Sequence, residues 1–293
     1  MGADHTRHIA IIVAAGRGTR MQADKPKVLL ELAGKPVLAY TLKAFVKCPW
    51  MDAVIVVAAA EYLEEMQEVA ETVADDGGAS ANADMTTKSS RSLAVGEILV
   101  VPGGAERTDS VRAGLAAAGE WLENLTGEPS PCQENLTGEL SPCYVYIHDG
   151  ARPLISQEVL ERVRDGVMQT GACVCGVPVK DTIREVSAAD GGADTAAGKG
   201  TAGDSPGKMV LAETFDRSRL RAIQTPQAFD LTEITAAYDK FAEGEAGSTV
   251  ATDDAMVYEA ATGKKVMIVE GDYRNIKLTT PEDMITAEAL VSR

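Results

Sequence analysis

Ala14-Ala15-Gly16-Arg17-Gly18-Thr19-Arg20-Met21 follows a short apolar run, Ile9 to Val13, and leads on to Pro26-Lys27. The apolar run predicts a β-strand. The small residues after it allow a tight turn that presents several backbone N–H groups to one anion. Four basic side chains lie in or near this turn, although the chain carries a formal net charge of -16: Arg17, Arg20, Lys25 and Lys27. A polyphosphate ligand explains this local positive charge better than a solvated surface does.

Two common glycine-rich loops do not match this stretch. The Rossmann dinucleotide fingerprint needs a third glycine three residues after Gly18, where Met21 stands. The P-loop needs Gly-Lys followed by Ser or Thr, which the stretch lacks. The stretch resembles the signature G-x-G-x-R-M-x(n)-P-K of nucleotidyltransferases, which join a sugar or polyol phosphate to a nucleoside triphosphate.

Length and composition limit the possible functions. The chain has 293 residues, 45% of them apolar, which is enough for one large α/β domain over 1–293. Its acidic balance opposes binding to nucleic acid or to an anionic membrane, and no apolar run is long enough to span a bilayer. We find no signal-peptide core, and five cysteines are an odd number for a disulfide framework. We therefore expect a cytoplasmic protein.

Strand-like and helical segments alternate along most of the chain. Besides the first run, strands are predicted at 53–58, 97–101, 144–147, 172–177 and 265–270. Helices are predicted at 36–47, 61–74, 104–121, 156–168, 230–241 and 252–261, and Thr280 with Pro281 predicts the start of the last one. This alternation predicts an α/β fold with a doubly wound, mostly parallel, Rossmann-like sheet.

Three segments have too few apolar residues to form a core, and we expect them to be surface insertions: 75–91, 123–143 and 187–208. The second holds a tandem duplication, in which Glu123 to Cys132 recurs with one change as Glu134 to Cys143. Two short copies cannot build a repeat fold, so a duplication within a loop is the economical interpretation.

The alternation of strands and helices breaks over residues 178–224. Two strand-like runs flank the third insertion there, a pattern that predicts an extended β-arm. Because an isolated two-stranded ribbon is only marginally stable, we expect the arm to pack on a second subunit and to make a homodimer.

Two further motifs follow predicted strands. Gly103-Gly104, with Arg107 and Ser110 in the next helical turn, forms a second polar rim, unless it is only a tight turn before a capped helix. Asp149 ends another strand and is our candidate ligand for the Mg²⁺ that accompanies a nucleoside triphosphate. The alternative interpretation makes Asp149 a turn residue that pairs with Arg152.

The combined motifs resemble one family, the 2-C-methyl-D-erythritol 4-phosphate cytidylyltransferases of the non-mevalonate isoprenoid pathway. The resemblance depends on the first loop, on Gly103-Gly104 with Arg107 and Ser110, and on five later motifs: His148-Asp149-Gly150-Ala151-Arg152-Pro153, Asp181-Thr182, Thr225-Pro226-Gln227, Thr252-Asp253 and Asn275-Ile276-Lys277. Ala105 and Val28 depart from it, because the family often has aspartate and glutamine at these positions.

This resemblance implies a homodimeric enzyme that uses CTP and Mg²⁺ and releases pyrophosphate. It places Arg20 and Lys27 at the transferring phosphate as catalytic residues. The residues it assigns to the nucleotide are Ala14, Ala15, Gly16, Gly18, Gly104, Arg107, Ser110 and Asp149, of which Asp149 also holds the metal. The residues it assigns to the polyol phosphate are Arg152, Asp181, Thr182, Arg217, Thr252 and Lys277.

Three alternatives remain open on the sequence. A ribitol 5-phosphate cytidylyltransferase would share the fold and the nucleotide loop and would differ in the polyol pocket. Residues 16–36 alone look more like a uridylyltransferase that activates N-acetylglucosamine 1-phosphate, although the later motifs do not. A catalytically silent nucleotide-binding regulator would keep the glycines but could lose Arg20, Lys27 or Asp149, and all three are present.

Overall fold

The structure is a computed structural model that describes residues 6–16, 25–77, 81–82, 97–126, 142–188, 209–244 and 251–292. It divides into two compact units. The first comprises Met1–Gly176 together with Gln224–Arg293, and the second comprises Val177–Ile223. None of the described helices combines the length and the apolar character that a membrane span requires.

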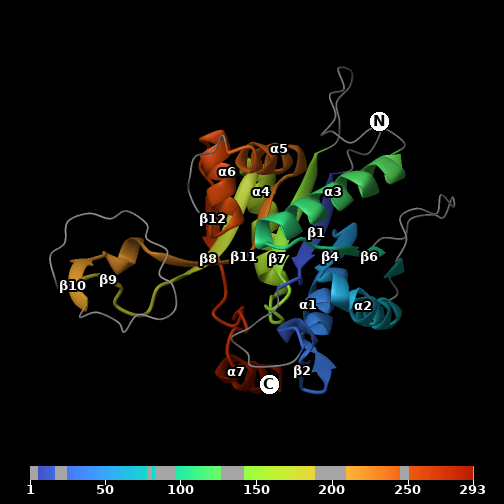
Figure 1. Ribbon diagram of the computed structural model, residues 1–293, viewed down its shortest axis with the longest axis horizontal. Coiled ribbons are helices and arrows are strands. Elements are labelled where there is room, and N and C mark those ends of the chain that lie inside the picture. Colours follow the sequence, from blue (N-terminus) through green and yellow to red (C-terminus); the bar gives the residue numbers. More distant parts are fainter. Residues whose placement is uncertain are drawn as a thin grey trace. The chain divides into compact units, whose positions relative to one another are not determined.

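An eight-stranded sheet in the order β12-β8-β11-β7-β1-β4-β6-β5 forms the centre of the first unit (Figure 1). Its strands are β1 (Arg7–Val13), β4 (Ala53–Ala58), β5 (Ala81–Asn82), β6 (Glu97–Pro102), β7 (Cys143–Asp149), β8 (Ala172–Pro178), β11 (Arg221–Asp230) and β12 (Met267–Glu270). β1 runs parallel to β4 and β7, and β12 runs parallel to β8. β11 runs antiparallel to β7. The predicted, mostly parallel sheet is therefore confirmed.

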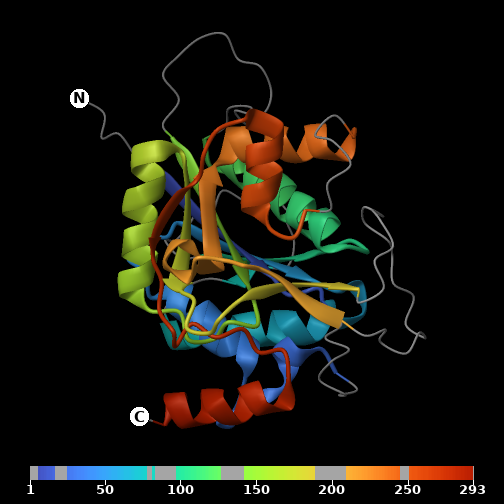
Figure 2. The same ribbon diagram turned by 90° about the vertical axis from the view of Figure 1, so that its left-hand side faces the viewer.

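Helices cover both faces of this sheet. Against one face pack α1 (Val37–Val46), α2 (Leu63–Gly77) and α4 (Gln157–Thr170), and against the other α3 (Arg107–Thr126), α5 (Leu231–Ala242) and α6 (Asp254–Thr262) (Figure 2). Alternating side chains of β1 feed the two cores: Ala10 and Ile12 lie in one apolar cluster, and Ile9 and Ile11 in the other. This arrangement confirms the doubly wound fold.

Short elements connect the sheet to its helices. After η2 (Lys27–Leu29), β2 (Glu31–Leu32) and β3 (Lys35–Pro36) form a small hairpin. Its turn has positive φ at both central residues, 46° at Ala33 and 80° at Gly34, as the primed turns of two-residue hairpins require. Pro36 is the residue before α1, whereas the helix was predicted to start at Pro36 itself. α7 (Pro281–Val291) starts with proline, as predicted, behind a Thr280–Asp283 capping box.

All three predicted insertions overlap regular structure at their edges, the third only at Ser187 and Ala188 of the strand Arg184–Ala188. α2 continues to Gly77 and β5 follows at Ala81–Asn82, within the first predicted insertion. α3 continues to Thr126, and Cys143 already belongs to β7, so both ends of the second predicted insertion were misplaced. α3 is longer than predicted because Leu122 and Leu125 extend its apolar face onto the core. Apart from Pro142, the remainder of these insertions lies outside the described residues.

The second unit contains the predicted hairpin. β9 (Arg184–Ala188) and β10 (Met209–Thr214) pair antiparallel, and η4 (Arg217–Arg219) follows them. Several large apolar side chains of this unit are exposed: Ile183, Val186, Met209, Val210, Leu211 and Phe215. Residues 189–208, which make up most of the third predicted insertion, lie outside the described part of the chain.

Candidate active site

The two glycine-rich segments meet at the carboxyl ends of β1, β4 and β6. The amide of Ala14 donates a hydrogen bond to the carbonyl of Val57 (2.8 Å), and the amide of Gly103 donates to Ala58 (2.7 Å). A Cβ atom on Gly103 would lie 2.9 Å from the Cβ of Ala15 and 2.8 Å from Ser110 Oγ. Glycine is therefore required where the first loop approaches the second rim. The structure thus brings Ala15 of the first loop close to Gly103 and Ser110, and Gly16 and Gly104 are next to these contacts in the chain.

The first turn of α3 is anchored inside the protein. The Arg107 guanidinium donates two hydrogen bonds of 2.7 Å to the carboxylate of Asp254 at the start of α6. Asp254 is fully buried and also accepts a hydrogen bond from the Tyr238 hydroxyl of α5 (2.5 Å). Ser110 donates to the carbonyl of Glu106 (3.1 Å). This network fixes the helix end that carries the second rim.

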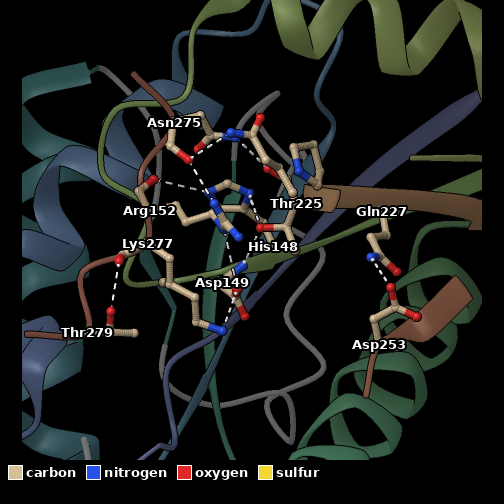
Figure 3. A network of polar contacts seen from close by, with 12 residues as sticks. His148, Asp149, Arg152, Thr225, Gln227, Asp253, Asn275, Lys277 and Thr279 are labelled. Atoms are coloured by element: carbon tan, nitrogen blue, oxygen red, sulfur yellow. Dashed lines mark hydrogen bonds and ion pairs between the residues drawn. The ribbon is translucent and has the colours of Figure 1, made fainter. Parts of the chain in front are cut away.

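Asp149, the last residue of β7, lies between two cationic side chains (Figure 3). Its Oδ2 atom is 2.9 Å from Lys277 Nζ and 3.5 Å from Arg152 Nε. Burial alone would raise the pKa of Asp149, but Lys277, Arg107 and Arg152 more than offset this effect and hold that pKa well below its usual range. The structure therefore brings an ionised carboxylate and two cations together at the edge of the sheet.

The other predicted site residues lie in different surroundings. Lys27 is the first residue of η2, and Thr252 lies just before α6, where its hydroxyl donates to Met256 Sδ (3.1 Å). Asp181, Thr182 and Arg217 are exposed residues of the second unit, and Arg217 Nη1 donates to the carbonyl of Lys180 (3.1 Å). Gly18 and Arg20 fall outside the described residues.

Three polar residues that sequence reasoning did not assign to the site make hydrogen bonds that hold its residues or the loops next to them. Asp254 holds Arg107, as described above. Asn275 is fully buried, its Nδ2 donates to the carbonyl of Thr225 (2.8 Å), and its own carbonyl accepts from Arg152 Nη1 (2.7 Å). Gln224 Nε2 donates to the carbonyl of Asp272 (2.8 Å) in the same loop. Asn275 belongs to a motif named from the sequence, and Asp254 and Gln224 are next to two others, Thr252-Asp253 and Thr225-Pro226-Gln227.

A divalent metal ion is compatible with Asp149. Within the described ranges, no three His, Cys, Asp or Glu side chains gather in a way that could hold a metal ion. Mg²⁺ commonly binds through one or two carboxylates together with substrate phosphates and water. The single ionised carboxylate of Asp149 therefore suits an ion that arrives with a triphosphate better than one bound permanently by the protein.

Comparison with known proteins covers nearly the whole chain. The family model for 2-C-methyl-D-erythritol 4-phosphate cytidylyltransferase matches residues 8–123 and 134–293. The unmatched residues between these ranges lie within the tandem duplication, as expected if one copy is an insertion.

Individual relatives match over the same length. The chain is 37% identical over 282 residues to the 2-C-methyl-D-erythritol 4-phosphate cytidylyltransferase of Halalkalibacterium halodurans, covering 96% of each protein. It is 36% identical over 275 residues to that of Lachnospira eligens, covering 94% of this chain and 95% of the relative. A crystal structure of the 4-diphosphocytidyl-2C-methyl-D-erythritol synthase from Anaerococcus prevotii superposes with a TM-score of 0.66 at 27% identity, over 99% of this chain and 100% of the other.

The sequence match, the shared fold and the position of the glycine loops all lead to one assignment. The chain belongs to the family of 2-C-methyl-D-erythritol 4-phosphate cytidylyltransferases.

Proposed function

We propose that this enzyme transfers the cytidylyl group of CTP to 2-C-methyl-D-erythritol 4-phosphate. The products are 4-diphosphocytidyl-2-C-methyl-D-erythritol, an isoprenoid precursor, and pyrophosphate. Family membership supports this activity. The structural observation that carries it is the cluster of Asp149, Arg152 and Lys277 at the carboxyl edge of the sheet that also bears both glycine rims.

Each group has a part in this proposal. The backbone of Ala14, Ala15, Gly16, Gly18 and Gly104 holds the nucleotide, together with Ser110 and the anchored Arg107. Arg20 and Lys27 stabilise the negative charge that develops at the α-phosphorus. Arg152, Thr252 and Lys277 face the polyol phosphate, as do Asp181, Thr182 and Arg217 of the arm. Such a site accelerates the reaction by orientation and electrostatic stabilisation.

No general base is needed in this mechanism. A phosphate monoester with a second pKa of ~6 is mostly dianionic at neutral pH and can attack without losing a proton to the enzyme. His148, the nearest histidine, is unsuited to that role. Burial lowers the pKa of His148 to about 4, and both of its ring nitrogens lie within hydrogen-bond distance of protein partners.

Mg²⁺ completes the proposed site. Asp149 would hold the ion that accompanies CTP, and the ion would neutralise charge on the triphosphate. Removal of divalent cations with a chelator should abolish turnover and added Mg²⁺ should restore it.

The substrate is tested by measuring pyrophosphate release with matched pairs of substrates. We expect release with CTP and methylerythritol phosphate, and little with CTP and ribitol 5-phosphate or with UTP and N-acetylglucosamine 1-phosphate. A preference for either of the latter pairs would replace the proposed substrate. Binding of CTP without turnover on any acceptor would favour a regulator.

The enzyme is proposed to act as a homodimer joined through the arm. The exposed apolar side chains of β9 and β10, such as Val186, Met209 and Leu211, would be covered by a second copy. Each active site would then combine Arg20 of one chain with Arg217 of its partner. The acidic composition fits the proposed cytoplasmic location, without nucleic acid or membrane partners. So do Cys48, Cys143, Cys173 and Cys175, which are buried and form no disulfide among the described residues.

Mixed dimers test the shared site. Differently tagged Arg20→Ala and Arg217→Ala chains are co-expressed, and heterodimers are isolated by tandem affinity. If the sites are composite, one site of each heterodimer carries both defects and the other carries none, so activity should return to roughly half of the wild-type value. If both arginines serve a site within one chain, every site carries one defect. Heterodimers as inactive as both parents would therefore exclude the composite site.

A further inference from the structure

A connected set of hydrogen bonds lies next to the charged cluster of Asp149, Arg152 and Lys277 (Figure 3). The amide N–H of Asp149 donates to Thr225 Oγ1 (3.1 Å), which lies 3.0 Å from Nδ1 of His148. Nε2 of the same ring lies 3.2 Å from the carbonyl oxygen of Arg152. The imidazole and the hydroxyl therefore connect the backbone at the first residue of the 149–152 turn to the backbone at its last.

The chemistry of these groups determines which atom donates and which accepts in each of these hydrogen bonds. A carbonyl oxygen can only accept, so Nε2 of His148 must donate to Arg152. In a neutral imidazole the other nitrogen then accepts, and the Thr225 hydroxyl must donate to Nδ1 while it accepts from Asp149. His148 is fully buried and Thr225 is 5% exposed, so solvent does not compete for these groups. One tautomer of His148 satisfies the whole set.

The backbone of Thr225 is also connected to the side chain of Arg152. The carbonyl of Thr225 accepts from Asn275 Nδ2 (2.8 Å), and the carbonyl of Asn275 accepts from Arg152 Nη1 (2.7 Å). Lys277 follows two residues later and reaches Asp149 at 2.9 Å. Hydrogen bonds thus connect Thr225 to the backbone of Asp149 and, through Asn275, to the side chain of Arg152.

We propose that His148 and Thr225 are positioning residues, and that the Nε2–H tautomer of His148, held by the Thr225 hydroxyl, sets the spacing between Asp149 and Arg152. Neither side chain contacts substrate in this proposal. It deepens the proposed function, because the groups that it positions are those assigned to the metal and to the polyol phosphate. Loss of the hydroxyl should therefore reduce catalysis without removing any charged group.

The tautomer is measured directly in the protein without ligands. The chain has three histidines, so a sample labelled with ¹⁵N only in histidine gives three pairs of ring resonances. Single His5→Gln and His8→Asn variants identify the pair that belongs to His148. We expect a proton on Nε2 and none on Nδ1. A proton on Nδ1, with or without one on Nε2, would overturn the proposal whatever reaction the enzyme catalyses.

Paired substitutions then test the positioning role. Thr225→Val keeps the size and branching of the side chain but removes the hydroxyl, whereas Thr225→Ser keeps the hydroxyl. With thermal stability measured in parallel, we expect kcat/KM for methylerythritol phosphate to fall by about tenfold or more in Thr225→Val, since small misplacements of reacting groups are costly. In Thr225→Ser it should remain within about threefold of wild type by the same argument.

The NMR measurement of the tautomer and the kinetic comparison of the Thr225 variants can each contradict the proposal independently. Equal kcat/KM values in the Val and Ser variants would refute positioning by the hydroxyl, even with the expected tautomer. If CTP and methylerythritol phosphate are not the substrates, the proposed function fails, but the NMR experiment still decides the tautomer because it uses no substrate.

Discussion

Replacing Lys27 by alanine is expected to lower kcat by on the order of 10²-fold or more. Lys27 begins η2, at the end of the segment that follows the first glycine loop. In the proposed reaction its ammonium group stabilises charge that develops only in the transition state. Removal of one such preorganised group costs about this much in other enzymes. Pyrophosphate release at saturating CTP and methylerythritol phosphate measures the effect.

Lys25 provides a matched control for this variant. It carries the same charge two residues earlier, its side chain is 62% exposed, and its Nζ lies 3.9 Å from Glu65 on α2. Lys25→Ala should leave kcat within about twofold of wild type, because an exposed charge in water contributes little. An equal loss in both variants would point to the general positive charge of the segment. Near-normal turnover of Lys27→Ala would place this lysine outside the site.

Replacing Asp254 by alanine is expected to lower the free energy of unfolding by about 3–5 kcal/mol. The carboxylate of Asp254 is fully buried and is held by both Arg107 and Tyr238. Its removal leaves the Arg107 guanidinium without its bidentate partner and the Tyr238 hydroxyl without an acceptor. Urea unfolding at one fixed protein concentration measures the loss, since the stability of an oligomer depends on concentration.

A surface ion pair between α3 and α5 is the control. Arg112 of α3 and Asp239 of α5 lie 3.4 Å apart, and both side chains are about half exposed. Asp239→Ala should change the free energy of unfolding by less than ~0.5 kcal/mol. A loss of similar size in both variants would show that burial of Asp254 adds nothing to the pair.

The sequence predicted those parts of the fold that depend on local pattern. The apolar runs at 9–13 and 53–58 had to be buried strands, and alternation with helices determined the layers. The place of β11 could not be predicted. β11 follows the arm in the chain, and its residues have a similar β propensity to those of the arm. Nothing in the segment identifies β7 and β8 as its neighbours. Only long-range packing decides that pairing.

In the candidate site, too, residues in local motifs could be predicted and residues that depend on long-range contacts could not. The positions of Gly16, Gly104 and Asp149 at the carboxyl ends of strands could be predicted, because each belongs to a short motif where a strand ends. Asp254 was not, since an aspartate that follows Asp253 at the start of a helix resembles an ordinary first-turn acid. Its partner Arg107 is 147 positions away in the chain. Charged pairs separated in this way leave no local pattern.

The position of β11 between β7 and β8 has a consequence for the nascent chain during its synthesis on the ribosome. Synthesis from the N-terminus delivers β1, β4, β6 and β7 first, and then β8 and the whole arm, before β11 emerges. Until then the strand that will cover the free edge of β7 does not exist, and unpaired N–H and C=O groups on such an edge recruit other chains. At roughly 5–20 residues per second, the arm prolongs this exposure by a few seconds. Nascent chains stalled within the arm should therefore aggregate or bind chaperones, and chains released beyond Asp230 should not.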